Sequence, residues 1–270
     1  MPEPTSSSLP LSGRKDEDLP GHWLLARMGK RVLRPGGQEL TEKLLADANL
    51  AGADVVELAP GLGKTATDIL ALSPRSYVGV EADAQAVALT EQAVGDRGSV
   101  VHADADATGL DSASADAVIG EAMLTMQSER GKGAILDEAF RVLRPGGRYA
   151  VHELSLHPDT LPDEAKTEIR QALARSIKVN ARPLTEAEWR ELFETAGFEV
   201  EQVRFAPMAL LEPRRMIADE GLLGVLKIVF NVARNPAARK RILAMRSVFT
   251  KYSDEMSAIE VIVRKPDVAA

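Results

Sequence analysis

The chain has 270 residues, of which 45% are hydrophobic and 27% charged, so it is long enough to bury one large core. It contains no cysteine, which excludes disulfide bonds and zinc sites built on thiolates. A formal net charge of -7, without a basic cluster interleaved with aromatic residues, argues against nucleic acid as a partner.

The N-terminal region divides into a tail and a helical part. Residues 1–20 are rich in proline, serine and charged residues and have little to bury, so we expect a disordered tail without the apolar core of a signal peptide. The pattern predicts two short helices over residues 23–29 and 38–48. Between them, the heptapeptide RVLRPGG at residues 31–37 recurs at 141–147, and we interpret both copies as helix stops.

The most informative stretch covers residues 53–65. A short apolar run containing Glu57 passes through a glycine turn into a helical pattern that starts at Lys64, which predicts a strand, a ligand-binding loop and a helix. Gly61 and Gly63 allow a ligand to approach the backbone closely. A carboxylate at Glu57 would repel a phosphate but suits a cationic amino-acid head group, such as that of S-adenosylmethionine (SAM).

Three other interpretations of this loop remain open at this point. A Walker loop ends in the required Gly-Lys-Thr, but Leu58 stands at its first glycine position. A dinucleotide fingerprint needs glycines at 61, 63 and 66, and position 66 is Ala66, which some variants accept. A strand-to-helix turn that binds no ligand is the third possibility.

Acidic residues also follow the next predicted strands. Residues 76–81 end at Glu81, which is suited to accept the hydroxyls of a ribose, and residues 99–103 precede Asp104, which is suited to an adenine amino group. Residues 115–120 precede Glu121, and Asp83 is expected to cap a helix. Because the acids at 57, 81 and 104 are 24 and 23 residues apart, they indicate repeated strand and helix units with a nucleoside site at one edge of a sheet.

The second half continues the alternation and then departs from it. A Thr185–Glu188 capping box predicts the start of one helix, and a long helical insertion precedes the last strand. The expected elements are helices over 128–143, 162–177 and 185–197, strands over 148–154, 198–205 and 257–263, a turn at 144–147 and the helical insertion at 207–256.

Residues 222–232 within the insertion are almost continuously apolar. The segment is too short and too interrupted to span a membrane. We expect a buried core or dimer helix, with a lid over an apolar substrate as the alternative.

The chain resembles the class I SAM-dependent methyltransferases that act on small molecules, and is similar in pattern to the ubiquinone and menaquinone biosynthesis methyltransferases. The resemblance covers roughly residues 53–205 and rests on the loop at 57–63, on Glu81 and Asp104, and on residues 140–147. Ala59 departs from the pattern, since the family usually has its first loop glycine there. The resemblance implies an α/β fold with a Rossmann-like, seven-stranded, mostly parallel sheet, helices on both faces, an N-terminal cover and a helical insertion.

The resemblance also implies the site residues. The residues expected to bind SAM are Glu57, Ala59, Pro60, Gly61, Gly63, Glu81, Ala82, Asp104, Ala105 and Glu121. Because open parallel sheets bind ligands beyond the carboxyl ends of their strands, the candidates for catalysis are His152 and Glu121, with His157 and His22 as weaker ones. No metal site is predicted. Arg34 is expected to make a surface cap contact, with a contact to the SAM carboxylate as the alternative.

These observations predict a single methyltransferase domain over residues 21–270, with residues 21–50 as the cover. We expect a cytoplasmic enzyme that transfers a methyl group from SAM to a small, apolar acceptor and has a homodimer as a possible assembly, without a nucleic-acid partner or a membrane span. The alternatives are a regulatory protein that binds SAM or S-adenosylhomocysteine without turnover, and an NAD(P)-dependent oxidoreductase.

Overall fold

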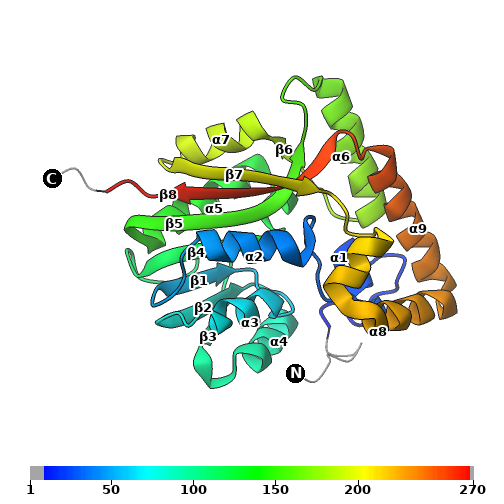
Figure 1. The fold of residues 1–270 in the computed structure, drawn as a ribbon, viewed down its shortest axis with the longest axis horizontal. Coiled ribbons are helices and arrows are strands. Elements are labelled where there is room, and N and C mark those ends of the chain that lie inside the picture. Colours follow the sequence, from blue (N-terminus) through cyan, green and yellow to red (C-terminus); the bar gives the residue numbers. More distant parts are fainter. Residues whose placement is uncertain (1–8, 268–270) are drawn as a thin grey trace.

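The computed structural model describes residues 9–267 and contains one eight-stranded sheet (Figure 1). Its strand order is β3-β2-β1-β4-β5-β8-β7, and the short strand β6 pairs with β5. Among these strands, β8 alone runs in the opposite direction and is antiparallel to both of its neighbours, β5 and β7. The strands are β1 Asp54–Leu58, β2 Ser76–Glu81, β3 Ser99–His102, β4 Ala115–Glu121, β5 Leu143–Leu156, β6 Leu184–Thr185, β7 Glu199–Pro207 and β8 Met256–Arg264. The predicted mostly parallel sheet is confirmed, and β6 is an addition.

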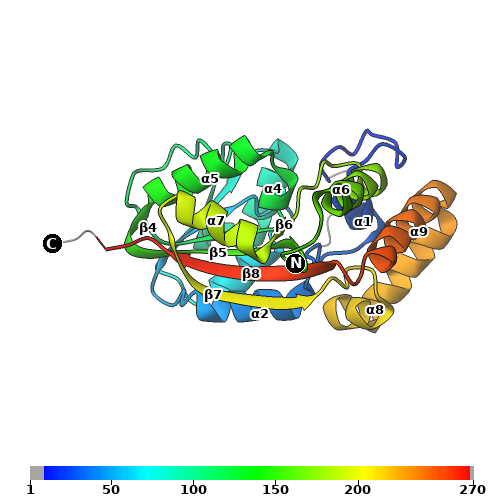
Figure 2. The same cartoon turned by 90° about the horizontal axis from the view of Figure 1, so that it is seen from above.

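Helices cover both faces of the sheet and also the carboxyl ends of its parallel strands. Figure 2 shows α5 and α7 on one face and α2 on the other, while α1, α6, α8 and α9 gather beyond the carboxyl ends of the parallel strands. None of the helices in residues 9–267 is long and apolar enough to cross a bilayer. The helices are α1 Gly21–Met28, α2 Gly37–Asp47, α3 Lys64–Ala71, α4 Ala84–Val94, α5 Glu129–Val142, α6 Asp163–Ile177, α7 Glu186–Thr195, α8 Pro213–Arg234 and α9 Pro236–Lys251.

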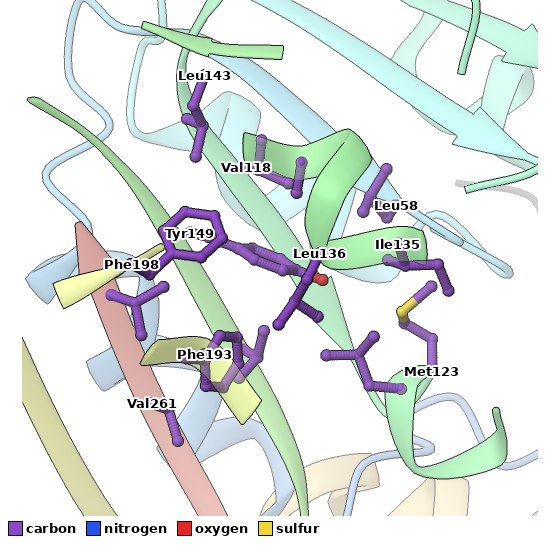
Figure 3. Close-up of a cluster of buried hydrophobic side chains, with 14 of the residues drawn as sticks. Leu58, Val118, Met123, Ile135, Leu136, Leu143, Tyr149, Phe193, Phe198 and Val261 are labelled. Carbon is purple, nitrogen blue, oxygen red and sulfur yellow. The ribbon is translucent and has the colours of Figure 1, made fainter. Parts of the chain in front are cut away.

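The sheet is buried on both sides because its central strands are apolar at successive positions. Side chains alternate between the faces of a strand, so Val55 packs with the residues of α2 and α3, and Val56 packs with those of α5 and α7. Tyr149 of β5 lies in the same core as Val56. Its ring centroid is 6.1 Å from that of Phe193 and 6.3 Å from that of Phe198 (Figure 3). This packing fixes the strand ends that carry the predicted acids.

Local capping chemistry agrees with the sequence. The Asp83 side chain accepts hydrogen bonds from the first backbone N–H groups of α4. At the start of α7, the Thr185 hydroxyl accepts from the backbone of Glu188, and the Glu188 carboxylate accepts from the backbone of Thr185. The capping box read from residues 185–188 is therefore confirmed.

Two predictions about the chain's local structure are wrong. Residues 9–20 are not a disordered tail: they form turns in which Leu9 and Leu19 are buried against other parts of the chain, while residues 1–8 lie outside the described part. The expected turn at 144–147 belongs to β5, which starts at Leu143. The pairing of β4 with β5 shifts register there, so the extra residues form a bulge that Arg144 fastens to Asp54 and Asp116.

The apolar segment 222–232 is also different from the expectation of a buried helix. It forms the second half of α8, after a non-helical break at Gly221, and only Ile228 of that helix is buried. Leu226 and Phe230 are 56% and 58% exposed. The helix packs on α1 through Ile228 and through a hydrogen bond from Asn231 to the carbonyl of Met28. Its other face is open.

The loop after β1 has three alternate residues in the left-handed region. Ala59, Gly61 and Gly63 have φ values of 53°, 60° and 70°. Glycine adopts this conformation freely, whereas an L-residue with a Cβ atom pays about 1–2 kcal/mol. Ala59 is held there because its backbone N–H donates to the carbonyl of Val80 at 2.8 Å. The departure from the family pattern therefore introduces local backbone strain.

We predict that Ala59→Gly raises the free energy of unfolding by about 0.5–1 kcal/mol, because relief of the left-handed strain exceeds the added entropy of the unfolded chain. Denaturant titration measures the change. Ala66→Gly, in the helical part of α3, is the control and should destabilise by about 1 kcal/mol. Destabilisation of both variants to the same extent would show that Ala59 carries no strain.

Candidate functional site

A cavity of about 190 Å³ lies at the carboxyl ends of β1, β2 and β4. The loop after β1 forms its floor, and the segment around α1 closes it from the other side. The lining residues that matter below are Glu57, Ala59, Pro60, Gly61, Glu81, Glu121, Ala122, His22, Trp23, Arg34 and Met126. The N-terminal cover and the strand ends, which are far apart in sequence, thus meet at one site.

Of the acids that line this cavity, Glu57 has the fewest hydrogen-bonding and cationic partners within the described chain. Its side chain is buried, and the only hydrogen bond to it among residues 9–267 comes from the Tyr77 hydroxyl at 2.6 Å. Burial, opposed in part by this hydrogen bond, raises the pKa of Glu57 to about 8. A carboxyl group that is buried at the wall of a cavity without a cationic partner is suited to a ligand that brings the positive charge.

Glu81 lies at the end of β2 and organises the glycine loop. Its carboxylate accepts the backbone N–H of Gly61 and the backbone N–H of Asp83, both at 3.0 Å. Burial raises its pKa, although these N–H groups counteract the shift. The carboxylate faces the cavity from the position that the sequence assigns to the ribose contact.

Glu121 is surrounded by donors. Its two carboxylate oxygens accept hydrogen bonds from the hydroxyls of Thr41 and Thr65, each at 2.5 Å, and the guanidinium Nε of Arg34 lies 3.0 Å away. Burial alone would raise the pKa of Glu121, but the charge of Arg34 and the hydrogen bonds from His152 and Thr41 lower it to about 2. Glu121 is therefore ionised at every pH at which the protein is expected to work.

Arg34 does not make the surface contact that the sequence predicts. It is 6% exposed, lines the cavity and also donates hydrogen bonds to Gln38, Thr41 and the Thr65 hydroxyl. Because Glu121 and these hydroxyls fix the guanidinium from several sides, its plane is oriented before any ligand binds.

His152 is fully buried, and protein groups face both of its ring nitrogens. The backbone N–H of Gly36 donates to Nε2 at 2.9 Å, which places the ring proton on Nδ1, 3.1 Å from Glu121. Neither nitrogen is open toward a cavity. This geometry is better suited to positioning Glu121 than to the catalytic role that the sequence suggested.

The other predicted residues lie outside the cavity wall. Gly63 packs α3 on α4, since a Cβ atom there would lie 2.6 Å from the Cβ of Ala93. Asp104 is exposed and bridges to Ala107 after β3, and neither Ala82 nor Ala105 lines the cavity. Their contacts to a nucleoside stay predictions. His157 follows β5 and lines neither this cavity nor the next one.

The arrangement also bears on the Walker interpretation of the loop. Lys64 is not free to meet a phosphate, because both carboxylate oxygens of Asp68 accept hydrogen bonds from its ammonium group at 2.6 and 2.8 Å. Thr65 is engaged by Glu121 and Arg34. A cavity whose walls carry Glu57, Glu81 and Glu121 is suited to a cationic ligand rather than to a chain of phosphates.

A second, mostly apolar cavity of about 60 Å³ adjoins the first. Four residues line both cavities and mark the junction: His22, Leu33, Ala122 and Met126. The far wall comes from α6, from the segment before α8 and from α9, through residues such as Leu173, Met208, Leu210, Met245 and Phe249. The sequence located the helical insertion but not these residues, because the spacing of apolar residues does not tell which of them face a cavity.

His22 is the titratable residue at this junction. Its ring lies 4.9 Å from that of Trp23 between centroids, and it makes no hydrogen bond to another of the described residues. Burial lowers the pKa of His22 to about 4, so the ring is neutral near pH 7. A neutral imidazole with open nitrogens between two cavities can accept a proton from a group bound beside it.

Comparisons with known proteins relate the chain to methyltransferases. A family model described as "Methyltransferase domain" matches residues 56–151, which hold the glycine loop and the three acids of the cavity. An uncharacterized protein of Haemophilus influenzae is 32% identical over 255 residues, covering 92% of this chain and 99% of that protein. A probable SAM-dependent methyltransferase of Mycolicibacterium smegmatis is 32% identical over 198 residues, covering 72% of this chain and 67% of the relative.

The fold is shared with solved structures as well. Phosphoethanolamine N-methyltransferase 2 of Haemonchus contortus, solved in complex with SAM, superimposes with a TM-score of 0.67 at 17% identity, over 94% of this chain and 58% of that one. The cavity at the strand ends fits SAM. Its buried Glu57 accepts one hydrogen bond and has no cationic partner among the described residues, so it is suited to a cationic ligand. The chain belongs to the SAM-dependent methyltransferases and is an enzyme that takes its methyl group from SAM.

Proposed function

We propose that the enzyme methylates a small, apolar acceptor that binds in the second cavity. The observation that carries this proposal is the junction at His22, Leu33, Ala122 and Met126, where the apolar cavity opens onto the donor cavity. Among residues 9–267, the only titratable side chain that lines the apolar cavity besides His22 is that of Glu153. Its oxygens already accept hydrogen bonds from the backbone of residues 123–125 and from the Thr125 hydroxyl. The acceptor is therefore held mainly by apolar contact.

The proposal gives roles to several charged side chains of the donor cavity. Bound SAM supplies an activated methyl group for in-line displacement by the acceptor. In this proposal Glu57 binds the ammonium group, Glu81 the ribose hydroxyls, and Arg34 the carboxylate of the donor. Glu121 and His152 hold the Arg34 guanidinium in place and do not contact the acceptor. The apolar walls of the neighbouring cavity exclude water from the transfer.

His22 is the residue that we propose to take a proton from the acceptor. It lies at the junction of the cavities, and its lowered pKa keeps the ring neutral at pH 7. A nearby sulfonium charge further disfavours the protonated ring before transfer. Once the acceptor gains a methyl group and a positive charge, its proton becomes strongly acidic, so even a weakly basic imidazole can remove it.

The acceptor class can be tested with methyl-labelled SAM. The enzyme is incubated separately with an organic and with an aqueous extract of cells, and labelled products are partitioned between the two phases. We predict that label appears in the organic phase, and that Leu210→Asp, which places a charge in the apolar cavity, raises the acceptor KM without changing SAM affinity. Label confined to the aqueous phase would contradict an apolar acceptor while leaving methyl transfer intact.

The roles of the two histidines predict different kinetics. For an acceptor that loses a proton on methylation, His22→Ala should lower kcat by about 10²–10⁴ with a small effect on SAM affinity. His152→Ala should instead weaken SAM binding and lower the melting temperature, because it removes one of the four buried donors to Glu121 and leaves the Gly36 N–H without its acceptor. The reverse pattern would return the catalytic role to His152.

We predict that the carboxyl group of Glu57 releases its proton when SAM binds. At pH 6 its carboxyl is protonated, since its pKa of about 8 lies above the pH, whereas Glu121, with a pKa of about 2, is already ionised. A bound ammonium stabilises the carboxylate, so binding should release close to one proton, and affinity should rise as the pH increases from 6 toward 8. Calorimetry in buffers of different ionisation enthalpy measures this release. Glu57→Gln is the control, which should bind more weakly and release none; equal release from both proteins would assign the proton to another group.

A further inference from the structure

The second half of α8 carries an outward apolar ridge, which we define as Leu222, Leu223, Leu226, Val229 and Phe230. These side chains are between 56% and 82% exposed, and Leu223 is the most exposed of them. At 100° per residue they fall within an arc of about 120°, opposite Ile228, which packs on α1. A contiguous exposed patch of this kind on a helix marks an interaction surface.

Positive charge surrounds the ridge. Lys227 and Arg234 lie at one edge of the arc, and the guanidinium of Arg234 is 5.2 Å from the centroid of the Phe230 ring. On α9, Arg239, Lys240 and Arg246 are exposed around Leu243, which is itself 57% exposed. Residues 221–250 contain six basic residues and no acidic residue, although the whole chain has 40 acidic and 33 basic residues. The hairpin of α8 and α9 is thus a basic, apolar region of an acidic protein.

Four of these basic residues stay outside the ion pairs of the described chain. No ion pair with another residue of the described chain is present for Arg234, Arg239, Lys240 or Arg246, whereas the acids of the first half of α8 are turned inward. Asp219 and Glu220 lie 3.8 and 3.4 Å from the buried ammonium of Lys30. The acidic part of α8 therefore holds the helix to the N-terminal cover, and the basic part is directed to solvent.

We propose that the α8–α9 hairpin docks on the surface of anionic lipid bilayers, with the apolar ridge in the interfacial layer and the basic residues among the headgroups. A bilayer of this kind offers an apolar layer and negative charge together, as a basic amphipathic helix requires. A second copy of the chain fits less well, because a two-fold interface on the ridge would bring identical basic residues together. Figures 1 and 2 show the hairpin at one end of the molecule, beyond the sheet.

The inner side of the same hairpin belongs to the apolar cavity. Met245 and Phe249 of α9 line that cavity, and Phe249 and Met208 also line an outer hollow whose rim carries Arg214 and Arg246. If the proposed apolar acceptor is taken from the bilayer, this hollow is its route to the site; that step rests on the proposed function. The docking itself rests only on the exposed hairpin.

Vesicle flotation of the full chain, with SAM present and no acceptor, tests the docking. We expect binding to vesicles of equimolar phosphatidylcholine and phosphatidylglycerol, weak binding to phosphatidylcholine alone, and loss of binding at about 1 M salt. The double variant Leu223→Glu/Phe230→Glu should not bind, and Arg239→Ser and Lys240→Ser should each weaken binding by about fivefold. SAM affinity and melting temperature should stay at the wild-type values in all of them.

Leu72→Glu is the matched control, since Leu72 is an exposed apolar residue outside the hairpin and should have no effect. Equal flotation of the wild type and the Leu223→Glu/Phe230→Glu variant would overturn the proposal. So would a wild-type dimer in size-exclusion chromatography that the double variant dissociates, in the absence of vesicle binding. Because no acceptor is used, failure here is independent of the proposed methylation of an apolar molecule.

Discussion

The ionised carboxylate of Glu121 is the interaction on which the geometry of the site depends. It ends β4 and receives Arg34 and Thr41 from the N-terminal cover, Thr65 from α3 and His152 from β5. A buried charge with one partner would be costly, but four donors satisfy both oxygens. Removing any donor leaves part of a buried charge unpaired, so the cover, the loop helix and two central strands are held in one arrangement.

Glu57 and Glu121 are buried carboxyl groups at the ends of neighbouring strands, and their different surroundings give them different pKa values. Glu57 and Glu121 lie on β1 and β4, which pair directly in the sheet. Burial dominates at Glu57 and raises its pKa to about 8, whereas Arg34 and the surrounding hydrogen bonds lower that of Glu121 to about 2. The fold satisfies Glu121, whereas the proposed function assigns Glu57 to the ammonium group of the donor. The same residue type thus supplies both structure and recognition.

The sequence predicts this part of the sheet well because β1, β2 and β4 are short apolar runs with an acid at or next to their last residue. Strand β2 spans residues 76–81 as predicted, and the acids at positions 57, 81 and 121 line one cavity. The heptapeptide RVLRPGG shows where such reasoning stops. One copy places Arg34 against Glu121 inside the site, and the other places Arg144 against Asp54 and Asp116 at a bulge. Only tertiary contacts distinguish the two copies.

In the helical insertion, apolar composition alone does not predict which residues are buried. The composition of residues 222–232 suggested burial, yet the fold supplies a neighbour for Ile228 alone, and the residues that do face the apolar cavity come from α9 and from the segment before α8. His22 likewise gains its place from the way α1 packs on α6 and α9, which no local pattern contains. The cavity beside Glu121 is built by residues at the ends of neighbouring strands, whereas the apolar cavity is built mainly by helices that are remote in sequence. In the proposed function, substitutions on those helices therefore change which acceptor fits while the contacts around Glu121 stay as they are.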